Sequence, residues 1–399
     1  MRQDTVLWAA QPEEGLHAAV FFPAAFLLLT LAGCAAQPVK PFEQPEEVEQ
    51  ITQEESRLWA EAERIDEALL DSGQVYPEAK LEKYLQQTIN SIYPGFQYTI
   101  RVRALKSPML NAFALPNGSI YFNIGLIARM ENEAQLATVL GHEAAHFIQK
   151  HSLRQTRQVK TMSAFALGMN IAGIPLIGDV IAISSIYGYS RDLERQADAL
   201  AYEHLQRAGY DVRESVKVFQ HLAAEAEALD EKQPVFFSSH PKLRERIESF
   251  DELIASSGQV GGRVERGAYL AQTQGLRLAC LEADLSMDRY KSLILVLESD
   301  DTARRFAAPH RYYYLGEAYR RRNEEGDVQR AELAYRQGLE QEPDFAATYR
   351  GLGILYLKMQ QPEKARPLLE KYLALAPDAK DRSYVEHYLE KLNAGGRQS

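Results

Sequence analysis

Two histidines and a glutamate near residue 142 have the types and the spacing of a metal-dependent catalytic centre. His142, Glu143 and His146 form an HExxH motif. Residues four apart on a helix lie one turn from each other and roughly 40° apart around the axis, so both imidazoles can share one metal ion. Glu143 would project beside that metal, where a carboxylate can take a proton from an activated water molecule. The motif therefore predicts a zinc-dependent hydrolytic site.

The helix that must carry this motif is predicted from the residues around it. Asn132, followed three residues later by Gln135, has the pattern of a capping box at a helix start. An apolar stripe follows at helical spacing, formed by Leu136, Val139, Leu140 and Phe147. The histidines would lie beside this stripe, in a half-buried cleft. The alternative is a helix whose histidines only pack or face water.

A second helix, predicted from Arg191 to Ala208 with Ser190 as its cap, supplies a third ligand. Glu194 and Asp198 lie four residues apart on one face of this helix. Glu194 can complete a His-His-Glu site and leave a fourth position open, as catalytic rather than structural zinc requires. Asp198 can accept the free N–H of a ligand histidine and fix its tautomer. Such an acidic pair can also be only a solvated face.

Four segments in this order resemble one family of metallopeptidases. They are NAFALPNGSIYFNIGLI (111–127), LGHEAAHFIQKH (140–151), SRDLERQADALA (190–201) and SSHPKLRERI (238–247). The combination resembles the gluzincin metallopeptidases of the CAAX prenyl protease and heat-shock protein X type. Within them it is most similar to the periplasmic beta-barrel assembly-enhancing proteases, which carry C-terminal tetratricopeptide repeats. The resemblance implies zinc at His142, His146 and Glu194, with Glu143 as the catalytic carboxylate and Asp198 in support.

His240 enters the site through the same resemblance. It matches a histidine on a loop over the active site, which in the periplasmic relatives can occupy the fourth zinc position and hold the enzyme inactive. From the residues alone, the segment 238–241 indicates a loop that enters a helix, with Pro241 in its first turn. There His240 could bind zinc, stabilise the oxyanion of a tetrahedral intermediate, or be exposed. His151, five residues past His146, is expected to point off the ligand face and to be structural or to support the ligands.

Two segments of alternating polarity, 97–104 and 119–123, predict strands on either side of the turn Pro116-Asn117-Gly118. In a zincin, an edge strand beside the metal helix can pair with an extended peptide, so that main-chain hydrogen bonds hold many sequences in one geometry. The alternative is an ordinary core hairpin without a role in substrate binding.

The N-terminal residues predict an exported lipoprotein. An apolar run over residues 18–32 leads into Leu31-Ala32-Gly33-Cys34, which matches a lipobox, so we expect a signal peptide over residues 1–33 and lipid on Cys34. Before the run Arg2 is the only basic residue, against three acidic ones, which suggests a later translation start. Ala35 after the cysteine resembles the default sorting to the outer membrane. Residues 34–50, rich in Pro, Gln and Glu, are predicted to be a tether.

Composition and charge narrow the other possibilities. The formal net charge of −10 argues against nucleic acid as a partner. Cys280 is the only cysteine besides Cys34, so a lipidated chain has no intrachain disulfide. A second apolar stretch, 162–187, is interrupted by polar residues, Pro175 and Gly178, and does not predict a clean membrane span. It is expected to pack on the core beside the cleft, or to form a lid that dips into the membrane.

The C-terminal third contains repeats of tetratricopeptide type. The pattern consists of Tyr312, Leu315, Gly316 and Tyr319, matched by Tyr349, Leu352, Gly353 and Tyr356. Each set is followed by an alanine (Ala331, Ala365) and a proline (Pro343, Pro377). The small residues Gly316 and Gly353 should let paired helices approach closely. Residues 267–299 would supply a degenerate earlier unit, and residues 381–392 a capping helix.

We therefore expect an α-rich α+β zincin-like peptidase domain with a small β-sheet, over residues 51–258, and an all-α helical repeat domain over residues 265–395. The expected function is that of a lipid-anchored zinc endopeptidase on the periplasmic side of the cell envelope, with one Zn²⁺ per chain. Unfolded or misassembled envelope proteins would be its substrates, and a protein partner would bind the repeats. The alternative is a repeat-based scaffold or chaperone with a capped or vestigial zinc site. An intact Glu143 favours the enzyme.

Overall fold

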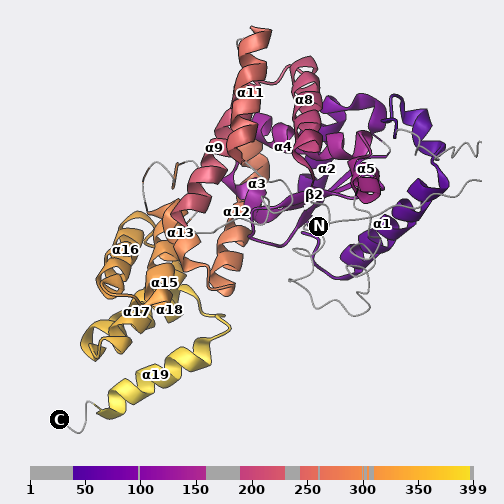
Figure 1. The fold of residues 1–399 in the computed structure, drawn as a ribbon. Helices are drawn as coiled ribbons and strands as arrows, with labels where there is room; N and C mark the ends of the chain where they lie inside the picture. Colours follow the sequence, from indigo (N-terminus) through magenta and orange to yellow (C-terminus); the bar gives the residue numbers. More distant parts are fainter. Residues whose placement is uncertain are drawn as a thin grey trace, which may run out of the picture. The chain divides into compact units, whose positions relative to one another are not determined.

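The computed structural model describes residues 39–97, 99–158, 189–229, 243–258, 261–298 and 310–395, together with residues 300, 303 and 304 (Figure 1). The predictions for the signal peptide, for Cys34, for the apolar stretch 162–187 and for His240 lie outside these residues.

A three-stranded mixed sheet forms the β part of the fold. Its order is β1 (Arg101–Leu105), β3 (Ser119–Asn123), β2 (Ala112–Ala114), with β1 parallel and β2 antiparallel to the central β3. The strand predicted over 119–123 is confirmed, although it is buried along its whole length rather than on one face. The first strand begins at Arg101 and not at residue 97, because the short helix η2 (Pro94–Phe96) precedes it. The edge strand β2 was not predicted, since three residues are too few to show a period.

The helices of the N-terminal two thirds pack on this sheet, on α4, which contacts it, or on one another (Figure 1). They are α1 (Gln53–Asp71), α2 (Ala79–Ile92), α3 (Ile124–Arg129), α4 (Glu133–Ile148), α5 (His151–Gln158), α8 (Arg191–Arg207), α9 (Arg213–Ala228) and α11 (Leu243–Ser257). Helix α4 carries the HExxH motif and packs against α2, α8, α9 and β2. All 16 of its residues are buried, so α4 is a central core helix, and its histidines lie deeper than in the half-buried cleft that was expected.

The starts of α4 and α8 differ in part from their predictions. Asn132 does cap α4, because its Oδ1 accepts a hydrogen bond from the Gln135 amide at 3.0 Å. The reciprocal bond of a capping box is displaced by one residue, since the Gln135 side chain accepts from the amide of Glu131 at 2.9 Å. Ser190 precedes α8 but makes no side-chain capping bond.

The C-terminal third is a series of antiparallel helix pairs. It comprises α12 (Arg266–Ser286), α13 (Tyr290–Leu297), α15 (Arg311–Arg322), α16 (Asp327–Gln341), α17 (Ala346–Lys358), α18 (Pro362–Leu375) and α19 (Arg382–Gly395). The close approach predicted at the glycines is confirmed. A Cβ on Gly316 would lie 2.6 Å from the ring of Tyr335, and one on Gly353 would lie 2.7 Å from Leu369.

Helix α12 is anchored in the N-terminal part by a buried arginine. The Arg277 guanidinium donates to the carbonyls of Ala128 at 2.6 Å and of Met130 at 2.8 Å. The hydroxyl of Tyr269 donates to the carbonyl of Ile127 at 2.5 Å. These carbonyls lie at the C-terminal end of α3, where a helix leaves acceptors without intrahelical donors. Helix α12 therefore caps α3.

A second polar cluster joins α3 to the first helix pair of the C-terminal third. Arg129, only 4% exposed, lies 3.2 Å from Glu225 of α9 and donates to the Ser292 hydroxyl of α13 at 2.8 Å. Its guanidinium also lies 3.5 Å from Asp284 of α12. Cys280 lies in the same cluster, where burial raises the pKa of its thiol to about 12, so it is a neutral, unreactive side chain.

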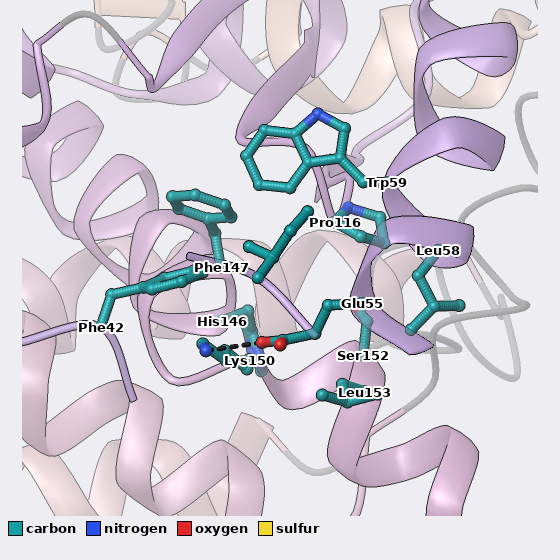
Figure 2. A pocket seen from close by; sticks show the side chains of 11 residues that line it. Phe42, Glu55, Leu58, Trp59, Pro116, His146, Phe147, Lys150, Ser152 and Leu153 are labelled. Atoms are coloured by element: carbon teal, nitrogen blue, oxygen red, sulfur yellow. Dashed lines mark ion pairs between the residues drawn. The ribbon is translucent and has the colours of Figure 1, made fainter. Parts of the chain in front are cut away.

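The chain from residue 39 onward lies on this body and is not a free tether. The Phe42 amide donates to the carbonyl of Ile148 at 2.9 Å, and its ring packs against that of Phe147 with centroids 5.4 Å apart (Figure 2). The Lys150 ammonium lies 4.0 Å from the centroid of the Phe42 ring and pairs with Glu55 of α1. The composition of residues 34–50 did not reveal this docking, because it depends on one aromatic side chain. Within the described part of the chain, no helix is long and apolar enough to cross a membrane.

Candidate metal centre

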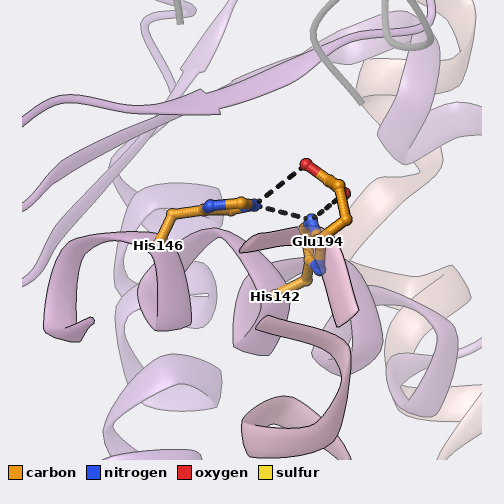
Figure 3. Close-up of side chains that lie close together, drawn as sticks. All are labelled: His142, His146 and Glu194. Atoms are coloured by element: carbon orange, nitrogen blue, oxygen red, sulfur yellow. Dashed lines mark hydrogen bonds and ion pairs between the residues drawn. The ribbon is translucent and has the colours of Figure 1, made fainter. Parts of the chain in front are cut away.

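His142, His146 and Glu194 converge in the interior of the molecule (Figure 3). The two Nε2 atoms lie 3.0 Å apart, and they lie 3.3 and 3.5 Å from the two oxygens of Glu194. Ligands of tetrahedral zinc with metal–nitrogen distances of 2.0–2.1 Å stand about 3.3–3.4 Å from one another. Two imidazoles and one carboxylate at these separations therefore fit a single zinc ion.

Small residues between α4 and α8 allow this convergence. Ala197 and Ala201 of α8 are fully buried, and a Cβ on Gly141 would lie only 3.5 Å from that of Ala201. The hydroxyl of Tyr93 donates to the carbonyl of Gly141 at 3.0 Å, and its ring packs on that of His204 of α8 with centroids 4.2 Å apart. Because the two helices approach so closely, Glu194 reaches both histidines from a neighbouring helix.

His142 is held by a chain of charged groups. Its Nδ1 lies 2.9 Å from Asp198 Oδ1, as the sequence predicted for this carboxylate. Asp198 in turn accepts from Arg246 of α11 at 2.7 Å, and the Arg246 guanidinium lies over the ring of Phe219. Burial and Arg246 lower the pKa of His142, but Asp198 and Glu194 raise it to about 9. The surroundings of this imidazole thus favour positive charge.

Arg246 was not assigned a role from the sequence. It belongs to the segment SSHPKLRERI, which is expected to enter a helix. An arginine on such a helix is usually exposed to solvent. The structure buries it at 3% side-chain exposure, against the ligand-supporting carboxylate.

Comparison with known families agrees with this geometry. Residues 77–254 match peptidase family M48, and residues 323–385 match the tetratricopeptide repeat. The chain contains an M48 peptidase domain. Because this is a family of metallopeptidases, a bound metal is implied, and the three converging side chains lie within the matched residues.

Several proteins are similar to part of this chain. The mitochondrial metalloendopeptidase OMA1 of Saccharomyces cerevisiae is 26% identical over 176 residues, which cover 43% of this chain and 51% of that protein. A putative beta-barrel assembly-enhancing protease of Vibrio cholerae is 29% identical over 194 residues, 45% of this chain and 40% of that protein. The metalloprotease YcaL of Escherichia coli is 28% identical over 186 residues, 45% of this chain and 69% of that protein. The chain spans about half or less of the first two of these relatives.

His146, the second candidate histidine ligand, has different surroundings from His142. His146 Nδ1 lies 2.8 Å from Nδ1 of His151, and its ring stacks on that of Tyr189 with centroids 3.8 Å apart. The hydroxyl of Tyr189 is 3.0 Å from that of Ser152. His151 was expected to point off the ligand face. That expectation assumed a continuous helix, whereas α4 ends at Ile148 and Lys150 adopts a left-handed φ of 52°.

A small cavity of about 30 Å³ lies beside His146 (Figure 2). Its lining is mainly apolar and comes from the docked N-terminal segment, α1, the turn after β2, the end of α4 and the start of α5; it includes Phe42, Leu58, Trp59, Pro116, Phe147 and Leu153. Glu143, the remaining member of the motif, is fully buried on α4 between the two ligands. The fourth-ligand prediction for His240 stays a prediction, since residue 240 lies outside the described part of the domain.

Proposed function

We propose that this chain is a zinc-dependent endopeptidase in which His142, His146 and Glu194 hold the metal and Glu143 is the catalytic base. One observation supports this proposal above all. Two imidazole nitrogens from α4 and a carboxylate from α8 meet in the interior of the molecule, with 3.0–3.5 Å between their atoms. Among the described residues three side chains converge in this way, and a fourth position left to water or substrate would distinguish a catalytic from a structural zinc site.

The chemistry divides between the metal and the chain. A zinc ion at this site supplies a Lewis acid for the scissile carbonyl and acidifies a water molecule. Glu143 then removes a proton from the attacking water and delivers it to the leaving amine, the two roles of one carboxylate in general base and general acid catalysis. Asp198 and Arg246 hold the His142 ring in the tautomer that leaves Nε2 for the metal. Main-chain pairing of substrate along the edge strand β2, which contacts α4, would place the peptide over the site.

Substitution of Glu143 by glutamine separates the base from the ligands. The purified Glu143→Gln protein should keep about one zinc per chain but lose casein cleavage by at least ~100-fold, as removal of a general base predicts. His142→Ala and Glu194→Ala should lose zinc as well as activity. Glu203→Gln, an exposed glutamate on α8, is the matched control and should behave as wild type. Undiminished cleavage by Glu143→Gln would reject the mechanism, and a zinc-free wild-type protein would favour the scaffold alternative.

We further propose that the enzyme acts at the cell envelope, anchored by lipid on Cys34. The lipobox sequence supports this, as does similarity to an Escherichia coli metalloprotease and a Vibrio cholerae protein named for beta-barrel assembly. Phe42 is docked on the M48 domain eight residues after Cys34, a stretch that spans at most about 29 Å when fully extended. A lipid on Cys34 would therefore confine the domain to the membrane surface. Cys34→Ala should abolish lipid labelling and membrane association, whereas Cys280→Ala should not.

The proposed substrates are unfolded or misassembled envelope proteins, delivered by a partner that binds the repeats. Helical repeats stack into extended surfaces of the kind that bind proteins. A deletion that tests recruitment should begin at residue 310, because α12 and α13 are bound to the M48 domain through Arg277 and Arg129. Removal of residues 310–395 should leave casein cleavage nearly intact and abolish co-purification with envelope partners. Loss of casein cleavage in a folded, zinc-loaded deletion protein would overturn the recruitment role.

A further inference from the structure

The two histidine ligands of the proposed zinc site are supported in different ways. His142 Nδ1 faces a carboxylate, at 2.9 Å from Asp198. His146 Nδ1 faces another imidazole, at 2.8 Å from Nδ1 of His151. Both histidines of this second pair are buried, with His151 fully inaccessible. Metal-bound histidines usually donate their second N–H to a carboxylate, a carbonyl or water, so an imidazole in this place requires an explanation.

The geometry determines where the protons of the pair must lie. Two ring nitrogens 2.8 Å apart form a hydrogen bond only if one carries a proton and the other does not. His146 Nε2 faces His142 and Glu194, so it must be bare to bind a metal, and its proton lies on Nδ1. His151 Nδ1 is then the acceptor, and His151 is a neutral ring with its proton on Nε2.

The backbone is arranged to create this contact. A continuous helix would turn residue 151 away from residue 146, since five residues correspond to roughly 140° around the axis after one full turn. Instead the chain breaks at Lys150, whose φ of 52° is rare for a residue with a side chain. The ammonium of Lys150 is fixed at 2.5 Å from Glu55 and over the ring of Phe42, and α5 then begins at His151. Residues from three segments thus stabilise the turn that returns His151 to His146.

We propose that His151 is a positioning residue that holds the metal ligand His146 as a neutral hydrogen-bond acceptor, in the place where a carboxylate is usual. This inference rests on the proposed function, because it requires His146 to bind metal through Nε2. The stacked ring of Tyr189 fixes the plane of the His146 imidazole, and His151 fixes its rotation within that plane. Without the acceptor, the ligand ring loses its tautomer preference and the restraint on its rotation within the plane.

Two substitutions at His151 separate the acceptor from the bulk of the side chain. His151→Asn places an amide oxygen near the position of Nδ1, whereas His151→Leu has similar volume and no acceptor. Zinc affinity is measured on the purified full chain by competition with a chromophoric chelator, and Co²⁺ substitution provides a ligand-field spectrum. We expect His151→Leu to weaken zinc binding by about 10–100-fold, as for other outer partners of metal ligands, and to alter the Co²⁺ spectrum. His151→Asn should stay within a few-fold of wild type on both measures.

His204→Asn is the matched control, since His204 is a partly buried histidine on α8 that bonds the carbonyl of Ile92 and lies outside the metal cluster. Circular dichroism establishes folding for each protein. If His151→Leu does not fold, His151→Gln replaces it, because its amide lies beyond the position of Nδ1. Wild-type zinc affinity in a folded His151→Leu or His151→Gln protein would overturn the proposal, and so would equal losses in the Asn and Leu proteins. A wild-type protein that binds no zinc would instead refute the proposed function itself.

Discussion

Arg277 gives the sharpest test of how the repeats are joined to the M48 domain. Its guanidinium is buried and donates to two carbonyls at the end of α3, those of Ala128 and Met130. In Arg277→Met both carbonyls lose this donor, and each buried acceptor left without a partner costs about 1–3 kcal/mol. Methionine also removes the penalty of burying a charge, which is seen in the lowered pKa of Arg277. We therefore expect the lower half of the summed range, about 2–4 kcal/mol of destabilisation.

The assay uses the chain without residues 1–33. After removal of residues 1–33, Trp59 is the only tryptophan, and it packs against Phe147 of α4 with centroids 6.2 Å apart. Its fluorescence during urea unfolding therefore reports on the M48 domain, 218 positions before the substituted residue in the sequence. Arg266→Met is the matched control on the same helix, because Arg266 is 42% exposed and its pair with Glu131 should contribute at most about 1 kcal/mol.

The outcome distinguishes two arrangements of the chain. If Arg277→Met shifts the Trp59 transition to clearly lower urea than Arg266→Met does, α12 is an energetic part of the M48 domain. If the two proteins have equal midpoints, the hydrogen bonds from α12 do not stabilise that domain. The repeats would then behave as a separate body that begins at α12, as the repeat pattern of the sequence alone suggested.

Two further predictions address the metal centre and the repeats. Asp198→Asn should weaken zinc binding by about 10–100-fold while the protein stays folded. The reason is that the amide can present an N–H group, instead of an acceptor, to His142 Nδ1. Unchanged zinc affinity in a chelator titration would contradict the role assigned to this carboxylate. Gly316→Ala should destabilise the repeats by about 1–3 kcal/mol in thermal unfolding, because its Cβ would lie 2.6 Å from the buried ring of Tyr335. Gly267→Ala is the control and should not destabilise them, because no atom lies within 4 Å of its added Cβ. Equal stability of the two alanine proteins would show that the repeat helices can shift to admit the methyl group.

The sequence was informative where spacing alone determines geometry. His142 and His146 share a helix face whatever surrounds the helix, and Glu194 and Asp198 are related to each other in the same way. The repeats were recognisable because their period is long and carries several residue types. In each case the signal lies within one element or one repeated unit, so tertiary packing was not needed to see it.

The sequence was uninformative where a role depends on contact between distant segments. Arg246 and Arg277 have the residue type of solvated helix faces, and only packing shows that each is buried against a specific acceptor. His151 faces His146 because of one left-handed residue, Lys150, whose conformation no local propensity favours. The docking of Phe42 escaped detection for the same reason, since its partner Ile148 lies far away in the chain, whereas β2 was missed because three residues are too few to show a period.

The charges around the metal centre explain why a neutral side chain is suited to position 151. Glu143, Glu194 and Asp198 are buried there together, and Arg246 lies close enough to interact electrostatically with all three. In their ionised forms these groups carry a net charge of −2, since three carboxylates face one guanidinium, and a divalent cation makes the cluster neutral. A carboxylate at position 151 would add a negative charge that nothing in this set balances, and an unbalanced buried charge is costly. A neutral imidazole at position 151 supplies the hydrogen-bond acceptor that His146 needs. It adds no charge, so the cluster stays neutral when a divalent metal is bound.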